Sequence, residues 1–210
     1  MNLLVMAKAP VPGHSKTRLC PPCTPAEAAA LAEAALADTL ETVAAAGARP
    51  VLALDGSPGP WLPAGFRVFP QRGDGLDERL ANAWDDAGGP AVQIGMDTPQ
   101  VTVALLGSAI AALEAPGTGA VLGPAPDGGW WALGLHRPQR RALIGVPMST
   151  PSTGAIQRRR LRALGLRVAT LPTLRDVDRF DDALAVAAEV PHSRFAQAVH
   201  RLGADRAVVS

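Results

Sequence analysis

The chain has 210 residues, of which 48% are hydrophobic and 19% charged, and its net charge is +1 at pH 7. This composition is typical of a folded globular protein and excludes a disordered chain. The near balance of charge offers no general attraction for nucleic acid or for an anionic membrane. No apolar run approaches a membrane span, and the first one, residues 3–7, is too short for a signal peptide. We therefore expect one soluble, cytoplasmic domain over residues 1–210.

The first eighteen residues join a buried strand to a basic loop. The apolar residues 3–7 predict the strand, and the loop after it contains Gly13 and three cations, Lys8, Lys16 and Arg18. Glycine allows close approach to a ligand, and loop N–H groups and basic side chains favour phosphate. The loop is either a phosphate-binding site or a solvated basic loop, and these residues alone favour neither. The spacing of a P-loop is absent.

Strands and helices then alternate through the first 120 residues. A Thr24–Glu27 capping box opens a predicted helix that ends near Ala46. We expect further helices from a cap at Asp74 to Ala87 and over residues 102–113, and strands over residues 50–54, 66–69, 90–95 and 119–122. Such alternation predicts an α/β three-layer sandwich with a mainly parallel sheet.

The later part of the chain adds elements of less regular order. Residues 130–136 predict a strand antiparallel to its neighbours, which makes the sheet mixed. A helix is expected over residues 153–164, with Ser152 or Thr153 as its cap. A last strand over residues 166–171 precedes a helix from about Arg179, which Asp178 could cap, and an amphipathic helix from Pro191.

Two groups of residues suggest chemistry without settling it. Asp97 follows the strand of residues 90–95, at the strand end where open α/β sheets bind ligands, although Asp-Thr-Pro is also good turn chemistry. Cys20 and Cys23 form a C-x-x-C pair, but the four histidines do not supply the spacing of a zinc site. We interpret the cysteine pair as incidental.

The string KAPVPGHSKTRL, residues 8–19, resembles the opening signature of a bacterial family of small nucleotide-diphospho-sugar transferase-like proteins. This family is described as a domain of unknown function or as glycosyltransferases, and it is similar to the guanylyltransferases of molybdenum-cofactor and 2-phospholactate (deazaflavin-cofactor) synthesis. The family has arginine where this chain has His14. Later strings extend the resemblance to residue 182. It implies the glycosyltransferase-A fold, a mixed, mainly parallel sheet between helices.

The resemblance also implies roles for particular residues. It assigns nucleotide binding to Lys8, Ala9, Pro10, Gly13, Lys16, Arg18, Gln71 and Gly73, and it places Gln71 near the base. Asp97 and Asp178 would hold Mg²⁺ or Mn²⁺, with Asp176 a weaker candidate. The acceptor would meet Asp127, Gly128, Gly129, Trp130, Ser149 and Thr150. Of Trp130 and Trp131, one is expected in the core and the other at the cleft.

The leading functional hypothesis is a magnesium-dependent nucleotidyltransferase with Lys16, Asp97 and Asp127 as catalytic residues. It would transfer a nucleoside monophosphate from a nucleoside triphosphate to a small phosphorylated acceptor and release pyrophosphate. The alternative is a glycosyltransferase that uses a nucleotide sugar, although its usual Asp-x-Asp pair would place an aspartate where this chain has Gly95. A third hypothesis is a non-catalytic nucleotide-binding protein. None of the three involves nucleic acid or a membrane.

Overall fold

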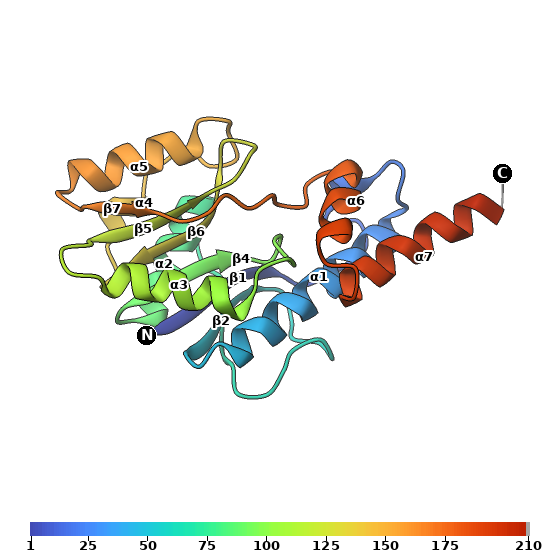
Figure 1. Ribbon diagram of the computed structural model, residues 1–210, viewed down its shortest axis with the longest axis horizontal. Helices are drawn as coiled ribbons and strands as arrows, with labels where there is room; N and C mark the ends of the chain where they lie inside the picture. The colour runs from blue at the N-terminus through green and yellow to red at the C-terminus, as the bar shows by residue number, and fades with distance from the viewer. Residues whose placement is uncertain (209–210) are drawn as a thin grey trace.

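A computed structural model of the chain describes the backbone of residues 1–208 and the side chains of residues 1–203. Within them, seven strands form one sheet in the order β3-β2-β1-β4-β6-β5-β7 (Figure 1). The strands are β1 (Asn2–Lys8), β2 (Arg49–Asp55), β3 (Arg67–Pro70), β4 (Ala91–Gly95), β5 (Ala120–Pro124), β6 (Trp130–Leu135) and β7 (Val168–Thr170).

The pairing of the strands confirms a mainly parallel, mixed sheet. Strand β6 runs antiparallel to β4 and β5, as predicted, and every other neighbouring pair is parallel. The six parallel strands therefore end at one edge of the sheet, and β6 begins there. The loops at this edge can therefore contribute side chains to one common site.

Helices cover both faces of the sheet and complete the predicted three-layer sandwich (Figure 1). Alternate side chains of β1 show why both faces are needed. Leu3 and Val5 pack in the same core cluster as α1 and α3, whereas Leu4 and Met6 pack in the cluster of α2, α4 and α5. These helices are α1 (Pro25–Ala45), α2 (Leu76–Ala87), α3 (Val103–Glu114), α4 (Arg140–Leu143) and α5 (Thr153–Ala163).

The last two helices pack away from the sheet. Helix α6 (Phe180–Glu189) and α7 (Arg194–Val208) share a third apolar cluster with the beginning of α1 and the short helix η1 (Thr17–Leu19). Phe195 is almost fully buried in this cluster, and its N–H donates to the Asp38 carboxylate at 2.8 Å. In Figure 1, α7 extends away from the rest of the chain.

Two predicted helix caps are wrong, although the helices themselves are confirmed within a few residues. Gly75, not Asp74, is the N-cap of α2, and the Asp74 N–H donates to the Glu78 carboxylate at 3.1 Å. Arg179, not Asp178, is the N-cap of α6, because the Asp182 carboxylate already accepts the Arg179 N–H at 2.9 Å. Asp178 is thereby left for another partner. The Thr24–Glu27 capping box is confirmed.

In the described part of the chain, no helix combines the length and the apolar content that crossing a membrane requires.

Candidate active site

Four segments meet where the parallel strands end. They are the loops after β1, β4 and β5 and an extended crossing segment, residues 171–179, that follows β7. The crossing segment is held by backbone hydrogen bonds along its length: Leu174 N donates to Pro124 O at 3.2 Å and Val177 N donates to Asp97 O at 2.8 Å. Its path places Asp176 and Asp178 beside the β4–α3 loop.

The first cavity at this edge, the basic pocket, has a volume of about 270 Å³ and is lined by Lys8, His14, Ser15, Lys16, Thr17, Arg18, Met96, Asp97 and Asp178. Two cations of the N-terminal loop are paired there with carboxylates from other segments. Lys16 Nζ lies 2.6 Å from Asp97 Oδ1 and also donates to the carbonyl of Val177. Arg18 lies 3.1 Å from Asp178 Oδ2. The pocket thus gathers three basic side chains, as a phosphate site requires.

The N-terminal loop holds Lys16 in an unusual conformation. Lys16 has φ = 51°, in the left-handed region that residues other than glycine seldom adopt. The loop before it is fixed by Ser15, whose hydroxyl donates to Ala9 O at 2.6 Å and accepts from Val11 N at 3.2 Å. Only 12% of the Lys16 side chain is exposed. The loop therefore directs a buried cation at the sheet edge.

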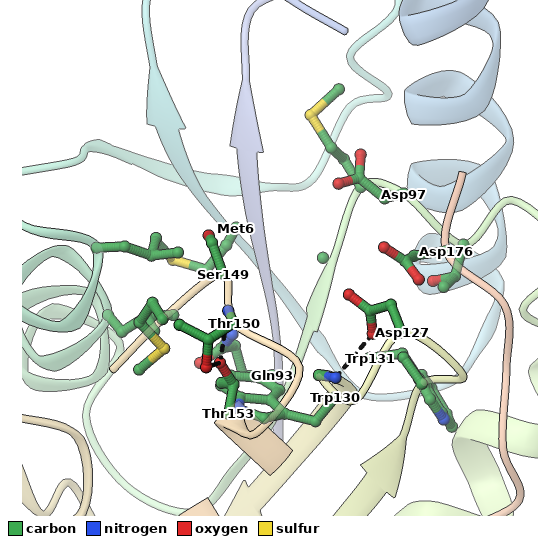
Figure 2. A pocket seen from close by; sticks show the side chains of 18 residues that line it. Met6, Gln93, Asp97, Asp127, Trp130, Trp131, Ser149, Thr150, Thr153 and Asp176 are labelled. Carbon is green, nitrogen blue, oxygen red and sulfur yellow. Dashed lines mark hydrogen bonds between the residues drawn. The ribbon is translucent and has the colours of Figure 1, made fainter. Parts of the chain in front are cut away.

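A second cavity, the acidic pocket, lies on the other side of Asp97 and has a volume of about 280 Å³. Asp97, Asp127 and Asp176 line it from three different segments and lie on one side of it (Figure 2). Met6, Trp130 and Met148 supply apolar walls. Ser149, Thr150 and Thr153 add hydroxyl groups. Hydroxyl-bearing and apolar walls next to carboxylates are suited to a small organic substrate.

The turn that carries Asp127 is locked against the start of α5. The Asp127 carboxylate accepts the Gly129 N–H at 2.7 Å, and Gly154 N donates to Gly128 O at 2.8 Å. Gly128 has φ = 89°, and a Cβ atom there would lie only 1.9 Å from the carbonyl oxygen of Pro151. Glycine is required at this position for two independent reasons, conformation and space.

Of the two adjacent tryptophans, Trp131 lies in the core and Trp130 is the more exposed, broadly as expected. Trp131 is only 3% exposed, and its indole N–H donates to Pro172 O at 2.9 Å, which ties the crossing segment to β6. Trp130 is half-buried, and its indole nitrogen is buried with no hydrogen-bond partner among the described residues. Both rings adjoin the acidic pocket.

The carboxylates of the acidic pocket repel one another. Burial raises the pKa of Asp176, and the negative charges of Asp127 and Asp97 raise it further, while Lys16 opposes them. Asp97 Oδ1 is buried and accepts no hydrogen bond of ordinary geometry from the described part of the chain, even with Lys16 Nζ close by. A cation between Asp97 and Asp176 would relieve both conditions, so the oxygen donors fit a hard divalent metal.

The described residues do not, however, form a closed metal cage. Among them, no group of three or more histidine, cysteine, aspartate or glutamate side chains is close enough to enclose an ion. Mg²⁺ does not need such a cage, because it keeps several waters and takes one or two carboxylates together with substrate phosphates. The residues therefore suit an ion that arrives with a nucleotide.

A side pocket of about 350 Å³, lined in part by Lys8, Gln71, Asp74, Arg79 and Asp97, adjoins the other two. The donor group of Gln71 is used within the protein. Its Nε2 donates to Ala7 O at 2.8 Å and to Ala53 O at 3.0 Å, so both amide hydrogens join β1 to β2. Only its amide oxygen is left to meet a ligand, as an acceptor.

The structure brings most of the predicted site residues to this edge. Asp97 lines all three pockets, Lys16, Arg18 and Asp178 line the basic pocket, and Asp127 lines the acidic pocket. Other predicted residues shape the loops without lining these three pockets; they are Ala9, Pro10, Gly13, Gly73 and Gly128. Asp176 was ranked below Asp178 on sequence, yet it is Asp176 that shares the acidic pocket with Asp97 and Asp127.

Residues 28–150 match the family model described as "Uncharacterized protein conserved in bacteria (DUF2064)". No curated protein matches the chain.

Many solved structures share the fold, among them the following three. A Desulfovibrio desulfuricans protein with the provisional name nucleotide-diphospho-sugar transferase is 24% identical, with a TM-score of 0.85 over 97% of this chain and 95% of that one. The 2-C-methyl-D-erythritol 4-phosphate cytidylyltransferase of Thermus thermophilus is 17% identical, with a TM-score of 0.56 over 90% and 98%. Rv0371c of Mycobacterium tuberculosis, solved with manganese, is 20% identical, with a TM-score of 0.52 over 88% and 96%. The fold is thus of the predicted glycosyltransferase-A type.

Proposed function

The chain belongs to the bacterial family DUF2064, and from this premise we propose that it is a metal-dependent nucleotidyltransferase. It would transfer a nucleoside monophosphate from a nucleoside triphosphate to a small acceptor and release pyrophosphate. One observation carries the proposal: a pocket of three cations and a pocket of three carboxylates adjoin at one residue, Asp97. The fold shared with a cytidylyltransferase supports the same class of reaction.

In this reaction the basic pocket would hold the phosphates. The acceptor attacks the α-phosphorus, a new bond forms to its nucleophilic oxygen, and the bond to the pyrophosphate oxygen breaks with its electron pair. Lys8, Lys16 and Arg18 would neutralise the triphosphate and the leaving pyrophosphate, which is electrostatic stabilisation by fixed groups. Lys16 would exchange its contact with Asp97 for one with a phosphate oxygen.

The carboxylates would hold the metal and the acceptor. We assign Asp97 and Asp176 to a Mg²⁺ or Mn²⁺ ion, and the manganese in Rv0371c supports a divalent metal in this fold. When bound, the ion supplies Lewis-acid charge to the phosphate oxygens. Asp178, the sequence prediction for the second ligand, is paired with Arg18 in the basic pocket. Asp127 would orient the acceptor through its free oxygen.

Nucleotide-sugar chemistry is the second candidate. The structure with a TM-score of 0.85 bears the provisional name of a nucleotide-diphospho-sugar transferase, and this observation favours a glycosyltransferase. Such an enzyme would place a diphosphate in the basic pocket. Three cations line that pocket, each of them within 4 Å of a carboxylate in the structure, and three cations fit the larger charge of a triphosphate better.

One assay separates the two reactions. The protein is incubated with each of the four nucleoside triphosphates or, in parallel, with nucleotide sugars, together with Mg²⁺ or Mn²⁺ and a panel of sugar phosphates and sugars, and both pyrophosphate and nucleoside diphosphate are measured. Release that depends on acceptor and is lost in Asp97→Asn is the expected result. Nucleoside diphosphate formed from a nucleotide sugar, without pyrophosphate from any triphosphate, would instead establish glycosyl transfer.

A further inference from the structure

The net charge of +1 conceals an uneven distribution of charge along the chain. Between Asp127 and Asp176 there is no aspartate or glutamate, whereas nine arginines lie there. These nine belong to the chain's 20 lysines and arginines, and all 19 acidic residues lie outside, so this stretch carries +9 and the remainder −8. A balanced total therefore does not prevent a surface formed by this stretch from attracting an anionic partner.

Five of the nine arginines form one surface on helices α4 and α5, the arginine face, which consists of Arg141, Arg158, Arg159, Arg160 and Arg162. Helix α5 buries Thr153, Gln157 and Leu161, so its arginines lie on the flanks and the outer side. Arg160 joins the two helices, because its guanidinium donates to two carbonyl oxygens at the C-terminal end of α4, each at 3.1 Å. Figure 1 shows α5 at the outer border of the molecule.

No carboxylate of the described residues neutralises the arginine face. Of the nine arginines, only Arg140 and Arg175 have a carboxylate of that part of the chain within 4 Å, and both lie outside the face. Arg158 donates instead to the hydroxyl of Thr170 at 2.7 Å, and Arg160 to the carbonyls of α4. These neutral partners hold the guanidinium groups in place without cancelling their charge. The face is thus partly preorganised for an anion.

The stability of α5 does not explain this arrangement. Arg158 and Arg162 are four residues apart, and like charges at this spacing destabilise a helix. Cations are favourable near the C-terminal end of a helix, which accounts for Arg160 and Arg162 in the last turn but not for Arg158 and Arg159. Arg159 and Arg162 are also exposed, and their side chains make no hydrogen bond to the described residues. Their charges are available to an external anion.

We propose that the arginine face docks on an anionic membrane surface. Basic side chains spread over the outside of two helices fit a plane of phosphate headgroups, and each one near the surface adds to the attraction. Arginine suits this surface because its planar fork of N–H groups matches the geometry of phosphate. Helix α5 begins at Thr153, which lines the acidic pocket, so the docked chain would hold its site near the membrane.

The composition of the stretch favours a membrane over other anionic partners. No phenylalanine, tryptophan or tyrosine occurs from residue 132 to residue 179, so the face offers no ring on which the bases of a single strand could stack. A protein partner would require an interface centre that is rich in aromatic residues and poor in charge, and the arginine face has the opposite character. No arginine of the face lines any of the three pockets at the sheet edge, so docking would leave them open.

Sedimentation of the full chain with lipid vesicles tests this docking. The vesicles contain phosphatidylcholine with or without about 30% of the anionic phosphatidylglycerol, at about 50 and 300 mM KCl. Arg159→Gln/Arg162→Gln removes two exposed charges from the face. Arg49→Gln/Arg201→Gln is the matched control, because it removes two exposed arginines of β2 and α7 and gives the same net charge. Binding to a DNA duplex of about 20 base pairs is measured with the same proteins.

We expect the chain to bind anionic vesicles at low salt and to lose this binding at high salt and on neutral vesicles. Arg159→Gln/Arg162→Gln should bind about ten- to thirtyfold more weakly, and the control should stay within about twofold of the wild type. The melting temperature of the first variant should be unchanged or higher, because a repulsion within α5 is removed.

Three results would overturn the proposal: no binding to the anionic vesicles, equal losses in the two double variants, or tighter binding to the duplex than to the vesicles. The sedimentation needs no nucleotide and no turnover. An absence of pyrophosphate release in the assay above would therefore refute the proposed function and leave the docking intact.

Discussion

The two pockets beside Asp97 have nearly the same volume, about 270 and 280 Å³, but opposite charge and different construction. All the cations of the basic pocket lie in the single stretch 8–18, which precedes helix α1. The carboxylates of the acidic pocket come from three segments that are remote in sequence. A compact motif can therefore be recognised in the sequence, whereas a pocket assembled from many segments needs the fold.

Asp97 joins the two pockets, and its removal should have the largest effect. Asp97→Asn keeps the size of the side chain but removes the charge that faces both Lys16 and the proposed metal. We expect the turnover number for pyrophosphate release to fall about 10³-fold, as for the loss of a principal electrostatic group. Asp181→Asn, an exposed carboxylate on α6, is the matched control and should stay within about twofold. Equal activity of the two variants would show that Asp97 takes no part in the reaction.

The cations of the basic pocket should differ from one another. Lys16 is buried and directed at Asp97, whereas 64% of the Arg18 side chain is exposed. Lys16→Met should weaken nucleoside triphosphate binding about ten- to hundredfold, because it removes a shielded charge. Arg18→Met should weaken it only about two- to fivefold, since solvent screens an exposed charge. Calorimetric titration of both variants measures the difference, and a larger loss for Arg18→Met would reverse the assigned roles.

The Asp127 turn can be tested through stability. Gly128→Ala adds a Cβ atom to a residue with positive φ and places it against the Pro151 carbonyl. We expect the free energy of unfolding to fall by about 2–4 kcal/mol. Gly13→Ala is the matched control, because Gly13 also has positive φ but a Cβ atom there would meet nothing within 4 Å. Its expected cost is only about 1 kcal/mol. Equal losses in urea denaturation would mean that the turn is not sterically locked.

The smallest expected effect concerns the pH dependence of stability. The folded state raises the pKa of Asp176, so ionisation of this group opposes folding above its ordinary pKa of about 4. Asp176→Asn imitates the protonated form and should therefore increase the free energy of unfolding at pH 7. Below about pH 4 both folded and unfolded wild-type chains are protonated there, and the advantage should vanish. An advantage that grows as the pH falls would contradict the raised pKa.

The position of the site at this edge of the sheet could be predicted from the sequence, because the motifs directly follow the predicted strands. Asp97 comes just after β4 and Lys8 ends β1, and parallel neighbours must finish at the same edge. The antiparallel β6 was predicted as well. Because β1 and β4 are parallel neighbours, the loop that carries Lys16 and the loop that carries Asp97 lie at the same end of the sheet.

What the sequence could not determine depends on irregular backbone and on strand register. The crossing segment has two aspartates two residues apart, and only its path, fixed by Val177 N bonding to Asp97 O, shows that Asp176 enters the acidic pocket. Gln71 stays a predicted base contact through its amide oxygen alone, because the β1–β2 register places two carbonyls within reach of its amide nitrogen. Neither contact has a signature in residue spacing.

Mn²⁺ binding is the sharpest test of the proposal that Asp97 and Asp176 form a metal site in the acidic pocket. Electron paramagnetic resonance with a nucleoside triphosphate present would compare Asp176→Asn with Asp178→Asn, two carboxylates of one short segment. We expect at least about tenfold weaker Mn²⁺ binding for Asp176→Asn and a change within about threefold for Asp178→Asn. Loss of Mn²⁺ binding in Asp178→Asn with Asp176→Asn unaffected would contradict it.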